Sequence, residues 1–480
     1  MLVVAGALLA VLGVTSTRYG FHRDELYFIV AGSHPAFGYP DQPPLVPLLA
    51  WAMHALSPGS PFLLRIPSAF ASAATTVIAA LVARELGGRR RAQLIAASCT
   101  AASGVALAVG HFVTTTTFDL LSTTAFLWLV IRAVVRRSGP SMLAAGIVVG
   151  VGTEAKPQVA FVAGAVFATL LAVGPRDVLR SWWTAGGIAA AVAIAAPYAL
   201  WQQAHGWPQL TVARNIAGSA EGGRAGFVPF QLVMVSPVLV PVWVAGLVAP
   251  FRRHALRALR FVTLTYLLLA VAYIAGDGKA YYLASLYPAL LGIGALPAAD
   301  WTARARGRLS LLVTAIALSA AASAFIALPL LPERSLQGSA PLAINPDLGE
   351  TVGWPRFVDT VSHAWNAIPA AERGRTAIFT ANYGEAGAID VLGRSRGLPR
   401  AYSGHNGFSE WGRPPAGDGH ALVIGFDGPS DAAPAFTGCR RVATVDDGVG
   451  LDNDEQGLPL LVCRPAESWS ALWPSLTHFN

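Results

Sequence analysis

The chain has 480 residues, of which 54% are hydrophobic and 13% charged, and its mean hydropathy is +0.50, which excludes an ordinary soluble protein of this length. The net charge of +7 does not indicate nucleic-acid binding, because the basic excess lies in the apolar part. Residues 1–332 contain 23 lysines and arginines against 10 acidic residues, whereas residues 333–480 contain 11 against 17.

Apolar segments follow one another through the first two thirds of the chain. The first, residues 2–16, has no basic residue before it, so we expect a transmembrane helix and not a cleaved signal peptide. Ten later segments are about as long as a bilayer requires, or somewhat shorter. They cover residues 62–83, 93–110, 119–135, 142–155, 157–173, 182–201, 228–250, 261–275, 281–298 and 309–331. The sequence therefore predicts about eleven transmembrane helices.

Basic residues distinguish the two sides of the predicted membrane domain. Five alternate loops contain 16 arginines, and the opposite loops contain 6 basic residues, so the first set is expected to be cytoplasmic. These loops are 84–91, 132–137, 176–180, 252–260 and 304–308. The first loop, residues 17–61, and the chain after residue 332 are then outside the cytoplasmic membrane. Segments 142–155 and 157–173 are separated only by Lys156 and Pro157, and the alternative is that they form one long segment. That alternative would place the basic loop 252–260 outside, which the charge asymmetry argues against.

The composition changes to mixed polar near residue 332, and no later run is long enough to span a bilayer. We predict a transmembrane domain over 1–332 and a small extracytoplasmic α/β domain over 333–480. Runs 376–381 and 420–426 are typical of buried strands, and 353–367 is typical of a helix. Cys439 and Cys463 either pair or stay free, because spacing alone does not prove geometry.

Charged residues follow the first apolar segment closely. Asp24 lies eight residues beyond residue 16, close to the outer end of this segment, where a partly desolvated carboxylate is able to accept a proton from an attacking hydroxyl or amine. We predict Asp24 as the catalytic base, with Glu25 in support and Arg23 shaping the cavity or binding the acceptor. The structural alternative is that Asp24 pairs with Arg23 or caps a surface helix.

Two further acidic positions are expected near the same cavity. In GlyTyrProAspGlnProProLeu (38–45) the prolines fix where Asp41 and Gln42 point, so both are predicted to shape the cavity or bind the acceptor. The alternative is a rigid turn without function. Asp119, at the outer end of segment 119–135, is predicted as a catalytic residue that shares the cavity with Asp24. Its alternative is a helix cap, for which Thr117 competes.

Lysine is rare in this chain, which has 32 arginines and only Lys156 and Lys279. Both are expected at the outer ends of membrane segments, where a compact ammonium group suits a phosphate. We predict that Lys279, Lys156, Tyr281 and Tyr282 bind a donor phosphate. The alternatives are interfacial snorkelling of the lysines, neutralisation of Lys156 by Glu154, and an aromatic belt for the tyrosines.

Other cofactor chemistry has little support in the sequence. His111 is predicted as a polar helix end that shapes the cavity. Histidines on the outer side permit a divalent cation without showing one, since no typical ligand spacing occurs, and no metal ligand is assigned. A P-loop and a dinucleotide fingerprint are both absent from the sequence, so cytoplasmic nucleotide chemistry is unsupported. Carboxylates and cations at the outer membrane surface are what transfer from a polyprenyl-phosphate donor requires.

The sequence resembles the GT-C membrane glycosyltransferases, in particular the bacterial branch grouped with protein O-mannosyltransferases and the lipid A aminoarabinose transferase. The matching pieces are ArgAspGluLeuTyrPhe (23–28), GlyTyrProAspGlnProProLeu (38–45), Arg65 with ArgGluLeuGlyGly (84–88), PheAspLeuLeu (118–121), GlyValGlyThrGluAlaLysPro (150–157) and LysAlaTyrTyr with TyrPro (279–288).

The resemblance implies inverting transfer of a hexose or pentose from a polyprenyl-phosphate donor to a lipid, protein or polysaccharide of the cell envelope. It implies that Asp24 acts as base or orients the acceptor, that Asp119 is the second acidic position, and that Lys279 and Lys156 bind the phosphate. Gln42 departs from relatives that carry lysine there. Residues 382–390 and 403–412 look like the C-terminal extension of some actinobacterial members, with acceptor binding as the expected role. Alternatives are a transporter or flippase for lipid-linked substrates, and a structural envelope protein.

Overall fold

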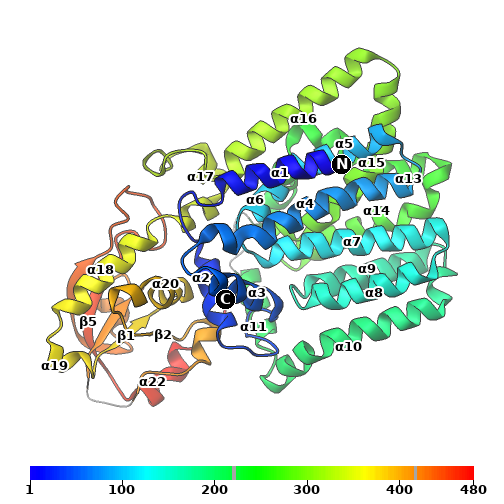
Figure 1. Cartoon of the computed structure of the whole chain (residues 1–480). Coiled ribbons are helices and arrows are strands. Elements are labelled where there is room, and N and C mark those ends of the chain that lie inside the picture. Colours follow the sequence, from blue (N-terminus) through cyan, green and yellow to red (C-terminus); the bar gives the residue numbers. More distant parts are fainter. Residues whose placement is uncertain (219–222, 416–418) are drawn as a thin grey trace. The chain divides into compact units, whose positions relative to one another are not determined.

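The computed structural model describes residues 1–218, 223–415 and 419–480, and its chain divides into two compact units (Figure 1). The first contains residues 1–16, 65–203 and 216–328, and the second contains residues 17–64, 204–215 and 329–480.

The first unit is helical throughout its described part, and every apolar segment predicted from the sequence forms helix there. Its α-helices are α1 Leu2–Thr15, α4 Pro61–Glu85, α5 Arg90–Ala101, α6 Gly104–His111, α7 Thr115–Arg136, α8 Gly139–Thr153, α9 Gln158–Val173, α10 Trp182–Ala204, α12 Gly223–Val235, α13 Val240–Arg252, α14 Arg260–Ala275, α15 Tyr287–Ala303 and α16 Arg306–Ala327. Short 3₁₀ helices are η1 Val178–Arg180, η2 Pro237–Leu239, η3 His254–Leu259 and η4 Ala280–Leu286.

The number of membrane spans differs from the prediction. Six helical stretches of the described chain are long and apolar enough to cross a bilayer, and the bent pairs α5 with α6 and α12 with α13 raise this to eight if each pair crosses once. The predicted number of about eleven is not confirmed, because α1, α8 and α9 have only 14, 15 and 16 residues, below the roughly 20 that a bilayer requires. Helices α8 and α9 are separate, as predicted, and break at Lys156 and Pro157.

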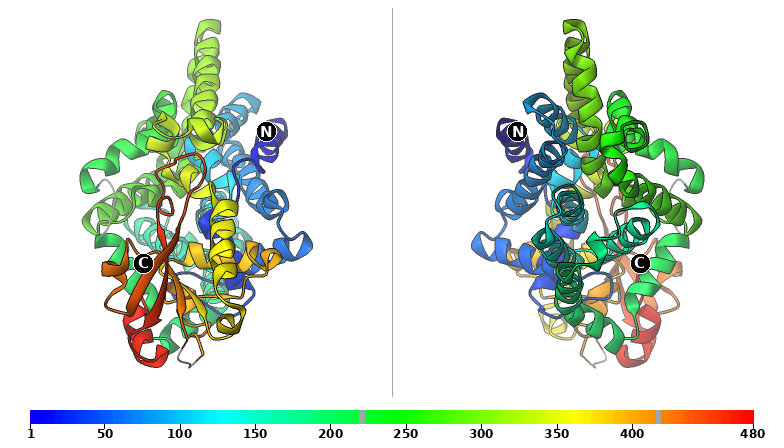
Figure 2. Two further views of the ribbon diagram at one scale, coloured as in Figure 1. Left: turned by 90° about the vertical axis from the view of Figure 1, so that its left-hand side faces the viewer. Right: turned by 90° about the vertical axis from the view of Figure 1, so that its right-hand side faces the viewer.

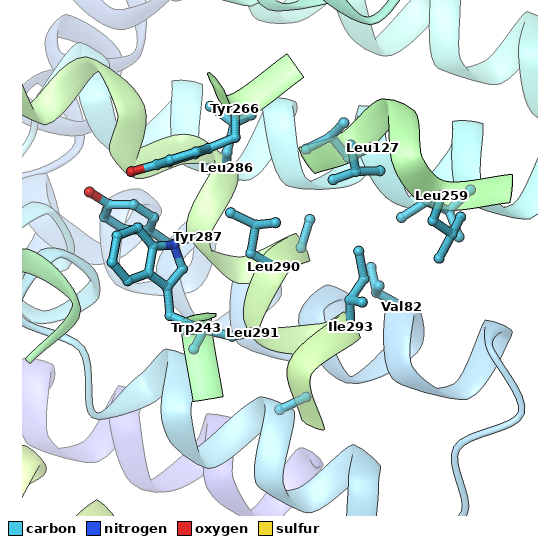
Figure 3. Close-up of a cluster of buried hydrophobic side chains, with 14 of the residues drawn as sticks. Val82, Leu127, Trp243, Leu259, Tyr266, Leu286, Tyr287, Leu290, Leu291 and Ile293 are labelled. Carbon is cyan, nitrogen blue, oxygen red and sulfur yellow. The ribbon is translucent and has the colours of Figure 1, made fainter. Parts of the chain in front are cut away.

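Aromatic and aliphatic side chains from several helices fill the core of the first unit (Figure 3). The ring of Trp243 on α13 lies 5.7 Å from that of Tyr266 on α14 and 5.8 Å from that of Tyr287 on α15. Helices α13 and α15 approach at backbone distance, since a Cβ atom added to Gly246 would collide with the carbonyl oxygen of Leu290. Helices α10 and α16 lie at the edges of this unit (Figures 1 and 2), and only 17% of the apolar window of each is buried.

The second unit contains a mixed five-stranded sheet with the order β2-β1-β3-β5-β4. The strands are β1 Ala377–Thr380, β2 Ala401–Ser403, β3 Ala421–Ile424, β4 Phe436–Thr444 and β5 Pro459–Pro465. Strand β1 is parallel to β2 and β3, whereas β5 runs antiparallel to β3 and β4 (Figure 2). Strands β1 and β3 confirm the two strands predicted from the sequence, and a disulfide joins Cys439 to Cys463 across β4 and β5.

Helices of the second unit come from the first loop and from the C-terminal region. They are α2 Arg23–Gly32, α3 Leu45–Leu56, α17 Ala340–Ile344, α18 Trp354–Ala367, α19 Ala370–Arg373, α20 Tyr383–Leu392, α21 Pro429–Ala432 and α22 Trp469–Leu476, with 3₁₀ helices η5 Glu333–Ser335, η6 Pro346–Thr351, η7 Arg394–Arg396 and η8 Asn406–Ser409. Helix α11 Pro208–Gly218 begins in this unit. Helix α18 confirms the helix predicted over 353–367. Helices α2 and α3 were not predicted within the first loop.

Candidate functional site

Helix α2 begins with a capping box that fixes the charged residues of the first loop. The His22 ring Nδ1 accepts a hydrogen bond from the backbone N–H of Asp24 at 3.1 Å, and Glu25 Oε2 accepts one from the backbone N–H of His22 at 2.8 Å. Glu25 is fully buried, and this reciprocal cap accounts for its position. The side chain of Asp24 is 33% exposed, so it is the more accessible of the two carboxylates.

Asp24 has a different partner from the two alternatives that the sequence offered. Arg23 forms ion pairs with Asp454 at 2.7 Å and with Glu350 at 3.4 Å, and within the described ranges no ion pair joins it to Asp24. The cap of α2 is His22. The hydroxyl of Tyr383, on α20, donates a hydrogen bond to Asp24 Oδ1 at 2.8 Å.

The proline-rich turn holds Asp41 at a fixed place. The backbone N–H of Tyr39 donates to the carbonyl of Gln42 at 2.9 Å, and the Tyr27 hydroxyl donates to Asp41 Oδ1 at 2.6 Å. Burial raises the pKa of Asp41 to about 7, against the lowering effect of the hydrogen bond from Tyr27. Gln42 is 4% exposed, and its amide nitrogen has no hydrogen-bond partner in the described part of the chain.

Asp119 lies in the second turn of α7 and does not cap this helix. The cap is Thr114, whose hydroxyl oxygen accepts a hydrogen bond from the backbone N–H of Thr116 at 3.3 Å. Asp119 is 2% exposed, and it accepts a hydrogen bond from the Thr123 hydroxyl at 3.0 Å. A buried carboxylate of this kind inside an apolar unit is a candidate for function.

Lys156 occupies the break between α8 and α9. Its Nζ donates to Thr116 Oγ1 at 3.0 Å and lies 5.0 Å and 5.3 Å from the ring centres of Tyr281 and Tyr282, so it makes a cation–π contact with each ring. Burial lowers the pKa of Lys156 to about 8; the charge of Asp119 opposes this shift, and that of Lys279 adds to it. Glu154 forms no ion pair with Lys156 among the residues that the structure describes.

The structure therefore groups the predicted residues into two clusters, one in each unit. The lysine cluster comprises Asp119, Lys156, Lys279, Tyr281 and Tyr282 in the first unit. The first-loop cluster comprises Arg23, Asp24, Glu25, Asp41 and Gln42 in the second unit. His111 is the last residue of α6 and is 3% exposed. Over residues 1–218, 223–415 and 419–480, no group of three or more histidine, cysteine or acidic side chains is placed to hold a metal ion.

Sequence reasoning missed Tyr27 and Tyr383, the two tyrosines that hold the acidic side chains of the first loop. Tyr383 is 359 residues away from Asp24 along the chain, and no local pattern links the two. One signal was available: Asn382 and Glu385 have the spacing of a capping box, which predicts a helix beginning at Tyr383.

Comparisons with known proteins agree with the helical architecture. Residues 41–201 match the family model described as dolichyl-phosphate-mannose-protein mannosyltransferase. No curated protein sequence matches the chain significantly. The structure is similar to ArnT from Cupriavidus metallidurans, solved in the apo state and bound to undecaprenyl phosphate, with a TM-score of 0.61 and 14% identity over 96% of this chain and 97% of that one.

The chain has the GT-C glycosyltransferase fold. The apolar helices together with this fold make the chain a multi-pass membrane protein. A second GT-C structure, the oligosaccharyltransferase of Archaeoglobus fulgidus tethered to an acceptor peptide, matches with a TM-score of 0.50 and 14% identity over 81% of this chain and 62% of that one.

Proposed function

We propose that this GT-C protein transfers a monosaccharide from a polyprenyl-phosphate donor to an acceptor of the cell envelope, at the outer face of the cytoplasmic membrane. The observation that carries the proposal is the set of contacts made by Lys156, one of only two lysines in the chain. It donates to Thr116 and makes cation–π contacts with Tyr281 and Tyr282. An ammonium group held in this way is able to pair with a phosphate. The relative bound to undecaprenyl phosphate supports the same class of donor.

The residue roles divide between the two clusters. Lys156 and Lys279 bind the donor phosphate, and the rings of Tyr281 and Tyr282 hold the Lys156 ammonium group by cation–π contacts. Asp24 accepts the proton of the attacking acceptor group.

The remaining acidic and amide residues of the two clusters have supporting roles. Asp119 keeps Lys156 charged and oriented. Asp41 and Gln42 shape the acceptor side; the unpartnered amide of Gln42 is a hydrogen-bond donor for that purpose. The match to a transferase family argues against the transporter alternative.

Label transfer in isolated membranes tests this function. The polyprenyl-phosphate sugar fraction, labelled metabolically and extracted from cells that make the chain, is added to membranes with and without it. We expect label to move into the envelope fraction only when the chain is present. Equal transfer by membranes that lack the chain would remove the proposal.

The side of the membrane is a separate prediction. The positive-inside pattern places Ser33 outside and Ser138 inside, and a disulfide between Cys439 and Cys463 suits an oxidising compartment. In intact cells, a membrane-impermeant thiol reagent should label Ser33→Cys and spare Ser138→Cys until the membrane is opened. The reverse labelling pattern would invert the proposed topology.

A further inference from the structure

Helix α20, from the C-terminal part of the chain, packs against α2 of the first loop at backbone distance. A Cβ atom added to Gly384 would lie 2.9 Å from the Cβ of Arg23, and one added to Gly387 would lie 3.1 Å from the backbone nitrogen of Tyr27. The two glycines are three residues apart and share one face of α20. Because the two glycines have no side chains, the helices approach closely, and this distance fixes where the other side chains of α20 meet α2.

Tyr383 is the first residue of α20, and its surroundings fix the direction of its hydroxyl. Asn382 Oδ1 accepts a hydrogen bond from the backbone N–H of Gly384 at 2.6 Å, and Glu385 Oε2 accepts one from that of Asn382 at 3.2 Å, which completes a capping box. The ring centre of Tyr383 lies 4.8 Å from that of Tyr27 and 4.8 Å from that of His405. A ring held on two sides and on a capped helix loses little further freedom when its hydroxyl binds a carboxylate.

The carboxylate of Asp24 has one anchored oxygen and one open oxygen. Oδ1 accepts the hydrogen bond from Tyr383 at 2.8 Å. Oδ2 lies 4.0 Å from His22 Nδ1, but this ring nitrogen is already the acceptor for the backbone N–H of Asp24, so it has no proton to donate. Within the described ranges, no other donor lies at hydrogen-bond distance from Oδ2. The side chain that contains this open oxygen is 33% exposed.

A second link from the C-terminal part reaches the other acid of the loop. The backbone N–H of Gly407 donates to the Tyr27 hydroxyl at 3.1 Å, and this hydroxyl donates in turn to Asp41 Oδ1 at 2.6 Å. Because the Tyr27 oxygen accepts one hydrogen bond and donates one, the proton on it points to Asp41. Residues 383 and 407, from two separate segments of the C-terminal region, thus each orient one carboxylate of the first loop.

We propose that Tyr383 is a positioning residue for Asp24, and that the C-terminal α/β region completes the acceptor side of the catalytic site by orienting first-loop carboxylates. The inference rests on the proposed function only where it takes Asp24 as the base. With Oδ1 fixed by Tyr383, Oδ2 faces the acceptor and takes up the proton as the new glycosidic bond forms and the polyprenyl phosphate leaves. The Tyr383 hydroxyl itself exchanges no proton with the substrate.

The test is a double-mutant cycle on the full-length chain in membranes, with transfer from the labelled polyprenyl-phosphate sugar fraction as the readout. Tyr383→Phe should lower kcat roughly tenfold and leave the KM for the donor within about twofold, since one hydrogen bond to a charged group is lost. In the Asp24→Asn background the same substitution should change kcat less than about twofold, because the side chain that Tyr383 orients no longer takes up a proton. Tyr19→Phe is the matched control: it removes a 2.8 Å hydrogen bond to the carbonyl of Leu331 in the same unit and should transfer like the parent.

The outcomes separate the two proposals. If Tyr383→Phe keeps the parental kcat while Asp24→Asn is inactive, the positioning role is wrong and the base assignment stands. An equal loss from Tyr383→Phe in both backgrounds also overturns the positioning role, because the tyrosine then acts on the fold and not through Asp24. When transfer by Asp24→Asn is too slow to compare, the split between kcat and KM in the single variant decides, and a change confined to KM counts against the inference. Parental transfer by Asp24→Asn would refute the assignment of the base instead.

Discussion

Replacing Asp24 with asparagine should lower kcat for sugar transfer about a thousandfold, within the range of about 10² to 10⁴ that a general base contributes. The substitution keeps the shape of the side chain and leaves an amide oxygen that still accepts the hydrogen bond from Tyr383. What it removes is the ability of the open oxygen to take up a proton. The loss should therefore appear in kcat, while the KM for the donor stays near the parental value.

Rates in membranes that contain equal amounts of each variant give the measurement. Asp359→Asn is a suitable control, because Asp359 is an exposed partner of Arg396 in the same unit, and a surface ion pair of this kind contributes about 0–1 kcal/mol to stability. It should transfer at the parental rate. Transfer by Asp24→Asn at that same rate would show that the chain uses another base.

Apolar runs were sufficient to predict where the helices of the first unit lie, because a helix in a bilayer must satisfy its own backbone groups. The number of spans was harder to predict, because α1, α8 and α9 are shorter than a bilayer requires and because two of the predicted spans are bent pairs of helices. A run such as 93–110 has the length and composition of one span, but Ser103 caps a new helix inside it, and the resulting pair is bent by 57°. Hydropathy averaged over such a run does not register one polar capping residue.

The first loop shows the opposite limit. Its charges singled out Arg23, Asp24 and Glu25 as residues to examine, and the capping box between His22 and Glu25 has a spacing that is visible in the sequence. The partners of those charges were not predictable, since Arg23 pairs with Glu350 and Asp454, and Asp24 with Tyr383. The contact between Asp24 and Tyr383 follows from the packing of α20 on α2, which depends on two glycines and not on any charge pattern.

Loss of the charge at Lys156 should weaken binding of the donor about thirtyfold. A hydrogen bond between a buried ammonium group and a phosphate contributes about 2 kcal/mol, which corresponds to that factor in Kd. Lys156→Met is the sharpest variant, because it keeps an apolar stem between the rings of Tyr281 and Tyr282 while it removes the charge. Undecaprenyl phosphate titrated onto the purified chain in detergent gives the Kd, and parental affinity in this variant would exclude Lys156 from the phosphate site.

The pH dependence of binding distinguishes the charge of Lys156 from its packing. Burial lowers the pKa of this lysine to about 8, so the ammonium group is present below that pH and is lost as the pH rises through it. Affinity of the free parent chain for undecaprenyl phosphate should then fall between about pH 7 and pH 9. In Lys156→Arg the side chain stays charged over this range, so its affinity, whatever its absolute value, should be nearly independent of pH. If the affinity falls equally with pH in both proteins, the group that titrates is not Lys156. Lys279 is then the cation to test, because it is the other positively charged residue that acts electrostatically on Lys156.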